Sequence, residues 1–232
     1  MESMSPLAET KATIEKAAEK AAAKGGAKGR LKIPELVAVS KTQPVGAILN
    51  LRKQGQLIFG ENYVQEMLEK KMELDAQGIY DIDFHFIGHL QSNKAKSILP
   101  HVSTIHSVDS IRLYEELVKR AEQIQKKISI YFQVNIDRET SKGGFSPQDL
   151  VDLHYQIKTK SNLWVKSIGL MTIPDPQFDS VRAFQEMQKL SAAYGDVLGS
   201  GLSMGMSKDY EIAIAYGATS LRIGTALFGT RD

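Results

Sequence analysis

The chain has no cysteine among its 232 residues. This absence excludes disulfide bonds, thiolate metal sites and a catalytic thiol, and it is compatible with a reducing compartment. No apolar run approaches the roughly 20 residues that a membrane-spanning helix needs. The formal net charge is only +2, so electrostatics give no reason to expect nucleic acid or a membrane as a partner. The N-terminus lacks the apolar core of a secretory signal, and we therefore expect a cytoplasmic protein.

The composition is that of an ordinary soluble protein, with 42% hydrophobic and 24% charged residues. Residues 7–23 are rich in Ala, Glu and Lys and predict a helix, which the glycines of residues 25–29 should end. The lysines of this helix could form a nucleic-acid patch, but interspersed glutamates favour a solvated face. We expect residues 1–30 to pack, as a helix and a Gly-rich turn, on a domain formed by residues 31–232.

From residue 31 onward, the pattern alternates between short apolar segments and longer amphipathic ones. Two apolar stripes at helical spacing run from Ile111 to Ile124 and from Val181 to Tyr194. Ser207 is expected to cap a helix beginning at Lys208, and Gly217 to end it. The strand candidates are Leu36–Lys41, Leu57–Gly60, Phe84–Gly88, Thr104–Val108, Ser129–Asn135, Val165–Thr172, Gly201–Met204 and Ser220–Gly224.

Strands that alternate with helices indicate a parallel sheet, because parallel neighbours need helical crossovers. The strand candidates match the number that closes a (β/α)₈ TIM barrel, whose usual size is about 250 residues. The alternative is an open doubly wound sheet. For dinucleotide binding that fold would show a Gly-rich turn after its first strand, whereas residues 40–43 contain no glycine. We therefore predict a single-domain TIM barrel with an extra N-terminal helix.

Lys41 directly follows the first apolar strand. In a closed barrel the first and last strands are neighbours, so Lys41 should lie near the end of the last strand. Partial burial there would lower the pKa of the amine and leave it nucleophilic, as imine formation requires. The alternative is a lysine that turns outward into solvent.

A candidate anion site lies after the last two strands, where TIM barrels often bind phosphate. Ser207 and the backbone N–H groups that follow Gly201–Met204 would form one half. Gly224 and Thr225 would form the other half, because glycine allows close backbone approach. Ser207 could equally be a simple helix cap. An imine-forming amine beside a phosphate cradle suggests a phosphorylated aldehyde, of which pyridoxal phosphate (PLP) is the obvious candidate.

Arg222 lies in an apolar strand, and alternation turns its side chain into the barrel. It should therefore contact either an inward carboxylate or a ligand atom. The chain's histidines show no metal-ligand spacing on a common predicted helix. Weaker candidates for the rim of the pocket follow other strands: Asn62, His89, Asn135 and Met171.

Several segments together resemble the pyridoxal phosphate homeostasis protein family, whose single PLP-binding barrel is similar to the N-terminal domain of alanine racemase. The resemblance runs from about residue 31 to residue 231. It is carried by Ala38–Thr42, Phe59–Tyr63, Phe86–Lys94, Gly169–Thr172, Gly201–Ser207 and Arg222–Thr225.

The resemblance implies that Lys41 carries PLP as a Schiff base and that Arg222 faces the pyridine nitrogen. It also implies that Ser207, Gly224 and Thr225 hold the phosphate, with Ser203 and Asn62 as further neighbours. An Arg at the pyridine nitrogen disfavours protonation there and weakens the ring as an electron sink.

Because the chain stops soon after the last strand, we expect an open pocket with no second catalytic domain, and a monomer. Such a protein would bind PLP for intracellular homeostasis without efficient turnover, with PLP-dependent apoenzymes as candidate recipients. A PLP-dependent racemase or lyase of low activity is the alternative, with His89 or a tyrosine opposite Lys41. A Schiff-base aldolase that uses Lys41 without PLP is a third reading.

Overall fold

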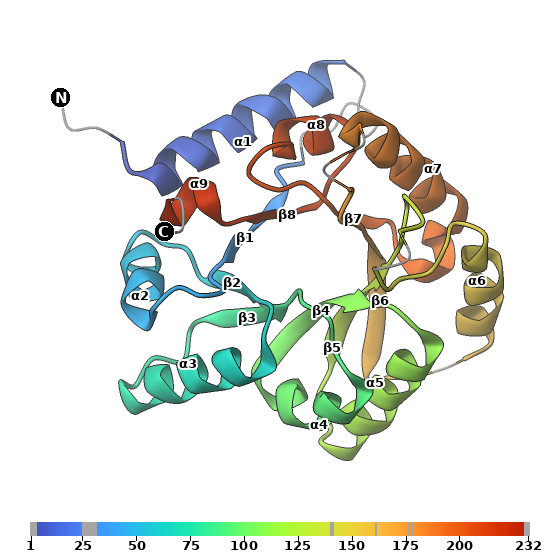
Figure 1. Ribbon diagram of the computed structural model, residues 1–232, viewed down its shortest axis with the longest axis horizontal. Coiled ribbons are helices and arrows are strands. Elements are labelled where there is room, and N and C mark those ends of the chain that lie inside the picture. The colour runs from blue at the N-terminus through green and yellow to red at the C-terminus, as the bar shows by residue number, and fades with distance from the viewer. Residues whose placement is uncertain are drawn as a thin grey trace.

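Eight parallel strands close into a barrel in the chain order β1 to β8, with β8 paired to β1 (Figure 1). This computed structural model describes residues 4–24, 32–139, 142–160, 162–175, 177 and 179–229. The closed barrel confirms the predicted (β/α)₈ TIM fold and excludes the open sheet. The strands are β1 Glu35–Val39, β2 Ile58–Glu61, β3 Asp83–Phe86, β4 Val102–Val108, β5 Ile128–Gln133, β6 Val165–Met171, β7 Gly201–Ser203 and β8 Ser220–Ile223.

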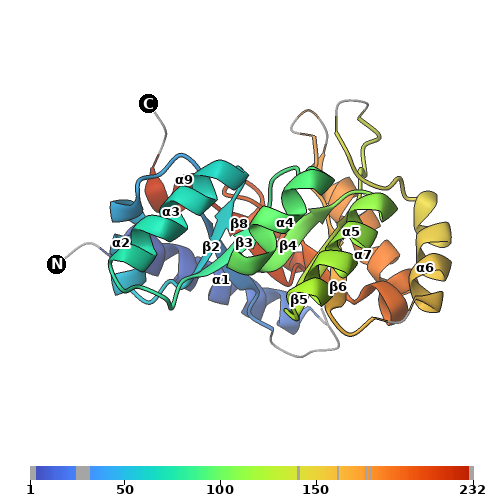
Figure 2. The ribbon, with the colours of Figure 1, turned by 90° about the horizontal axis from the view of Figure 1, so that it is seen from below.

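The helices form a ring outside the barrel, and Figure 2 shows α3, α4 and α5 covering one side of it. Both predicted apolar stripes lie on helices, α5 and α7. The main helices are α1 Pro6–Ala23, α2 Val45–Lys53, α3 Val64–Ala76, α5 Ile111–Gln123, α6 Asp149–Thr159 and α7 Ser180–Leu198. Shorter ones are α4 Ala95–Ile98, α8 Tyr210–Ala215, α9 Thr225–Phe228 and the 3₁₀ turns Ser92–Lys94 and Leu99–His101.

The apolar core lies mainly between the barrel and this ring. Side chains alternate along each strand, so that Leu36 and Ala38 of β1 join the outer core while Val37 and Val39 face the barrel interior. In the register of β1 and β8, Val37 lies beside Arg222. The Arg222 side chain is therefore inside the barrel, as the sequence predicted.

Helix α1 begins at Pro6 because the Ser5 hydroxyl accepts a hydrogen bond from the Ala8 N–H and proline suits the first helical position. Leu7 and Ile14 are buried on one face of α1, which contacts α8 and α9 (Figure 1). The Gly-rich turn expected at residues 25–29 lies outside the described residues. Within the described chain, no helix is long and apolar enough to cross a membrane.

The start of α8 differs from the sequence prediction. The helix begins at Tyr210 rather than at Lys208, and Asp209 occupies the N-cap position. The Asp209 carboxylate accepts a hydrogen bond from the Met206 N–H at 2.7 Å, which closes the preceding turn. The prediction that Ser207 caps this helix is therefore wrong. Gly217 has a φ of +88° just after α8, which confirms it as the residue that ends the helix.

Candidate functional site

Lys41 lies in a turn at the carboxyl end of β1 and is half-buried. The strand itself ends at Val39, two residues earlier than predicted. Thr42, the next residue after Lys41, has a φ of +64°, a left-handed conformation that is uncommon for a non-glycine residue. Such a turn persists only where neighbouring contacts hold it.

A buried network of charges holds the residues on both sides of Lys41. The Lys70 ammonium donates to the Ser40 carbonyl and to a carboxylate oxygen of Glu61, both at 2.7 Å. The Ser40 hydroxyl donates to the same Glu61 oxygen at 2.6 Å. Glu66 accepts from Lys70 at 2.7 Å and from the Thr42 N–H at 2.5 Å. Helix α3 and strand β2 thus fix the backbone that presents Lys41.

Burial gives this network a large electrostatic cost. Glu61 is fully buried and only 7% of the Lys70 side chain is exposed. Desolvation raises the pKa of Glu61 above its ordinary value, although hydrogen bonds from Lys70 and Ser40 act to lower it. A buried pair of this kind is weak evidence for stability. We infer that the network serves to hold the Lys41 turn.

The segments after β7 and β8 meet near this turn. The Ala226 N–H, in the first turn of α9, donates to the Ser207 hydroxyl at 3.3 Å. A Cβ added to Gly224 would approach the Val39 carbonyl oxygen at 3.3 Å, so β8 ends in close contact with β1. The structure therefore brings Ser207, Gly224 and Thr225 together at the end of the barrel where Lys41 lies.

Arg222 is 4% exposed and reaches across the barrel interior. Its guanidinium donates to the Ser203 hydroxyl at 2.5 Å and to the Thr172 carbonyl at 2.8 Å. Desolvation lowers the pKa of Arg222 to about 10, which leaves it charged at neutral pH. Among the described residues, no carboxylate lies at ion-pair distance from it. The inward carboxylate considered from the sequence is thus not found in the described chain.

Ser203 is fully buried, and its hydroxyl contacts both Arg222 and His106. Asn62 follows β2, and its side-chain oxygen is buried with no hydrogen-bond partner. The Asn62 backbone lies so close to Gly88 that an added Cβ there would approach the Asn62 carbonyl oxygen at 2.0 Å. Glycine at position 88 is therefore required for Asn62 to lie where it does.

The weaker rim candidates have other environments. The His89 side chain is 70% exposed and lies 3.1 Å from Asp109, as a polar loop histidine would. Asn135 uses its amide to bind the Glu139 and Lys142 carbonyls and the Glu139 N–H, so it closes the loop after β5. Met171 is fully buried in the barrel.

Sequence reasoning missed two groups of residues near this site. Glu61 and Lys70 carry no local signal, since their pairing joins a strand to a helix. His85 lies between two phenylalanines on its strand and His106 follows Ile105 on the next strand, and alternation could have placed both inside the barrel. The search for metal-ligand spacing on helices could not reveal them.

Comparisons with known proteins agree with this geometry. Residues 21–232 match the family "Alanine racemase, N-terminal domain". The pyridoxal phosphate homeostasis protein of Pasteurella multocida (strain Pm70) is 40% identical over 205 residues, covering 85% of this chain and 87% of that protein.

Solved structures of PipY from Synechococcus elongatus PCC7942 are also similar to this chain in sequence and fold. The form without PLP is 32% identical, with a TM-score of 0.83, covering 97% of this chain and 98% of PipY. The form with PLP bound is 35% identical, with a TM-score of 0.76, covering 84% of this chain and 92% of PipY. Sequence, barrel topology and the placement of the strand-end residues lead to one conclusion. The chain belongs to the pyridoxal phosphate homeostasis protein family, and its barrel to the family of alanine racemase N-terminal domains.

Proposed function

We propose that this protein binds PLP in the cytosol, as a Schiff base on Lys41, and takes part in PLP homeostasis. One observation carries the proposal: pairing of β1 with β8 puts the Lys41 turn at the same barrel end as Gly224 and the Ser207–Ala226 contact. The names of the relatives and the PLP-bound form of PipY support it.

The residues present fit PLP in charge and shape. The Arg222 cation is buried without a described ion-pair partner, which suits a neutral ring nitrogen as acceptor. The buried Asn62 oxygen lacks a partner in the protein and could accept a hydrogen bond from a ligand. Gly224 presents bare backbone beside the first turn of α9, where N–H groups lack helical acceptors.

Each residue then has a role. PLP supplies an aldehyde that an amine can attack. Lys41 would supply that amine. Ser207, Gly224 and Thr225 would hold the phosphate, while Arg222 would serve the ring nitrogen and Asn62 would offer its oxygen to the ligand. Ser203 acts through Arg222, since the hydroxyl contacts that guanidinium.

We further propose that the protein carries PLP without efficient turnover and releases it to apoenzymes. Arg222 remains a cation at neutral pH, and a cation there disfavours the protonated ring that carbanion chemistry uses. His89, one of the sequence candidates for a second base, is mostly exposed and beside Asp109. Amino acids incubated with PLP-loaded protein in deuterated water should show only trace exchange at the α-carbon. A kcat near 10 s⁻¹, the common enzyme median, would overturn this part of the proposal.

The covalent site can be tested directly. Protein loaded with PLP and reduced with borohydride should give a single phosphopyridoxyl peptide, at Lys41. Lys41→Ala should lose the adduct and the yellow absorption band yet remain folded, because a half-buried turn residue adds little to the core. Arg222→Ala should keep the adduct but retain PLP less well. An adduct on another lysine, or an undiminished band in Lys41→Ala, would refute the assignment.

The protein should act as a monomer. The barrel closes on itself, so among the described strands none offers a free edge for pairing with another chain.

A further inference from the structure

A continuous row of polar side chains crosses the barrel interior from Arg222 to the opposite end. Ser203 Oγ lies 2.5 Å from the Arg222 guanidinium and 2.7 Å from His106 Nδ1. His106 Nε2 lies 3.0 Å from His85 Nδ1, and His85 Nε2 lies 3.5 Å from Asp83 Oδ2. The row joins strands β8, β7, β4 and β3, and we call Ser203, His106 and His85 the barrel relay.

The side chains of the relay are buried. Ser203 and His106 are fully buried, and His85 is 3% exposed. The Tyr131 ring lies against His106, with centroids 4.6 Å apart. Desolvation, followed by the charges of His85 and Arg222, puts the pKa of His106 well below its ordinary value, so that His106 is neutral. A neutral imidazole has one donor and one acceptor nitrogen.

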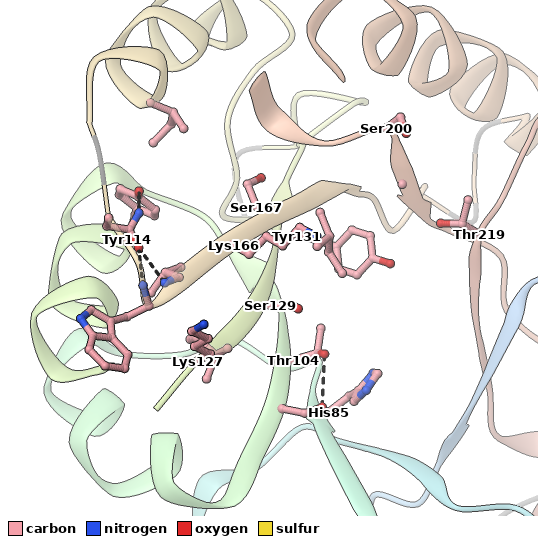
Figure 3. Close-up of a pocket in the computed structure, with 18 of the residues that line it drawn as sticks. His85, Thr104, Tyr114, Lys127, Ser129, Tyr131, Lys166, Ser167, Ser200 and Thr219 are labelled. Carbon is pink, nitrogen blue, oxygen red and sulfur yellow. Dashed lines mark hydrogen bonds between the residues drawn. The ribbon is translucent and has the colours of Figure 1, made fainter. Parts of the chain in front are cut away.

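The far end of the relay opens into a cavity at the amino end of the barrel. The cavity has a volume of about 1030 Å³. Figure 3 shows His85, Ser129 and Tyr131 among the residues that line it. Its lining includes residues at strand starts, such as Glu35 and Thr219, together with residues of α5, α6 and α7. The cavity is therefore at the opposite end from Lys41, and the relay connects the two ends.

Hydrogen-bond chemistry favours one direction for the relay. Arg222 can only donate, so Ser203 accepts from it and can pass its own hydrogen to His106 Nδ1. His106 Nε2–H then donates to His85 Nδ1, and His85 Nε2–H points to the Asp83 carboxylate. Every group has a partner in this arrangement. A buried cation is thereby linked through Ser203, His106 and His85 to a carboxylate across the barrel.

Several charged groups act on His85 at the far end. Asp83 precedes it on β3, Glu35 of β1 lies 3.9 Å from its Nδ1, and His106 of β4 contacts it. Burial acts to raise the pKa of Asp83, but hydrogen bonds from His85 and Ser103 and the charges of His85 and Lys126 outweigh it, so that the pKa is lowered. Lys32, Lys127, Lys160 and Lys166 also line the cavity, while Tyr131 and Arg222 face His106.

We propose that His106, acting through Ser203, is a positioning residue for Arg222. The proposal rests on the proposed function, because it concerns how firmly Arg222 binds PLP. His106 Nδ1 accepts the hydrogen of the Ser203 hydroxyl, which directs the oxygen of that hydroxyl toward the Arg222 guanidinium. Without this acceptor, the Ser203 hydroxyl holds Arg222 less firmly, and PLP release should be faster.

The first test is the rate of PLP release from loaded protein at pH 8. His106→Phe should release PLP about five-fold faster than wild type, the effect of one lost hydrogen bond. His106→Gln keeps one acceptor and one donor, so it should restore release to close to the wild-type rate.

His154→Gln is the matched control, since His154 is a mostly buried histidine on α6 that contacts Tyr155 and Tyr194 rather than the relay. This control should keep the wild-type rate. Release by His106→Phe at the wild-type rate, or release by His106→Gln several-fold faster than wild type, would overturn the proposal. The second comparison remains informative if His106→Phe does not fold.

A second test needs no PLP and separates this proposal from the proposed function. Nitrogen-15 NMR of the PLP-free protein at pH 8 should show His106 with the proton on Nε2. An Nδ1–H form present at pH 8 would overturn the relay, whereas failure of PLP binding alone would overturn only the proposed function.

Discussion

Three charged side chains are buried in this barrel, although an apolar core needs none. Arg222, Glu61 and Lys70 are all less than 10% exposed. Taking such groups out of water costs several kcal/mol for each ion unless partners compensate. Each one lies within or beside the candidate site, and each holds a backbone or side-chain geometry there. We interpret this burial as destabilising the folded state while it fixes the geometry of the site.

Lys70→Met tests this cost. The change leaves the buried Glu61 carboxylate without its ammonium partner, so we expect a loss of about 3 kcal/mol in the free energy of unfolding at pH 7.5. Removing Lys70 raises the pKa of Glu61 further above its unfolded value. The folded state then binds a proton more tightly than the unfolded state, so the variant's stability falls as pH rises and its deficit shrinks as pH is lowered.

Lys71→Met is the neighbouring control, because Lys71 pairs with Asp75 nearer the surface. It should change stability by less than about 0.5 kcal/mol. Urea unfolding at pH 5.5 and 7.5 measures both variants. If both variants lose the same free energy of unfolding, Lys70 does not compensate a buried Glu61 charge. The same conclusion follows if the stability deficit of Lys70→Met grows on acidification.

Among the elements, helix α1 has an unusual place in the barrel. It precedes β1 in the chain, yet it contacts α8 and α9 (Figure 1). Those two short helices flank β8 and follow the segments that contain Ser207 and Gly224. Helix α1 therefore supports the backbone that we propose as the phosphate cradle.

Ile14→Ala tests that support. Ile14 is 2% exposed, and truncating a buried isoleucine leaves a cavity, so we expect a loss of about 3 kcal/mol in the free energy of unfolding. Lys16→Ala, on the exposed face of the same helix, should have almost no effect. Chemical denaturation checks both. A loss below about 1 kcal/mol for Ile14→Ala would mean that α1 is docked only loosely.

At the scale of the whole molecule, barrel closure has two consequences. It joins residues from the two ends of the chain, since β1 and β8 pair over four positions from Glu35↔Ser220 to Ala38↔Ile223. It also removes sheet edges that could pair with a second copy of the chain.

Light scattering should therefore give a mass near 25.7 kDa at micromolar concentration, whether or not PLP is bound. A stable mass of twice that value would show that the helical surface, rather than a sheet edge, carries an interface between copies.

The sequence by itself determined the alternation of strands and helices, the interior direction of Arg222 and the closing of α8 at Gly217. These features follow from periodicity and turn chemistry within a few residues, which short-range sterics and hydrogen bonds decide. Strand ends were less well determined: β1 stops at Val39 rather than at Lys41. Ladder partners on neighbouring strands set where pairing stops, and the local pattern does not contain them.

Only the tertiary structure decided how the candidate site is held. Ser203 and His106 are 97 residues apart, and Lys70 reaches Ser40 across 30 residues. Such contacts depend on strand register around the closed barrel and on how α3 packs against it. Register is a property of the whole barrel, because each strand's position is set by both neighbours. The residue types at the site could therefore be chosen from the sequence, but the network that orients Lys41 and Arg222 could not.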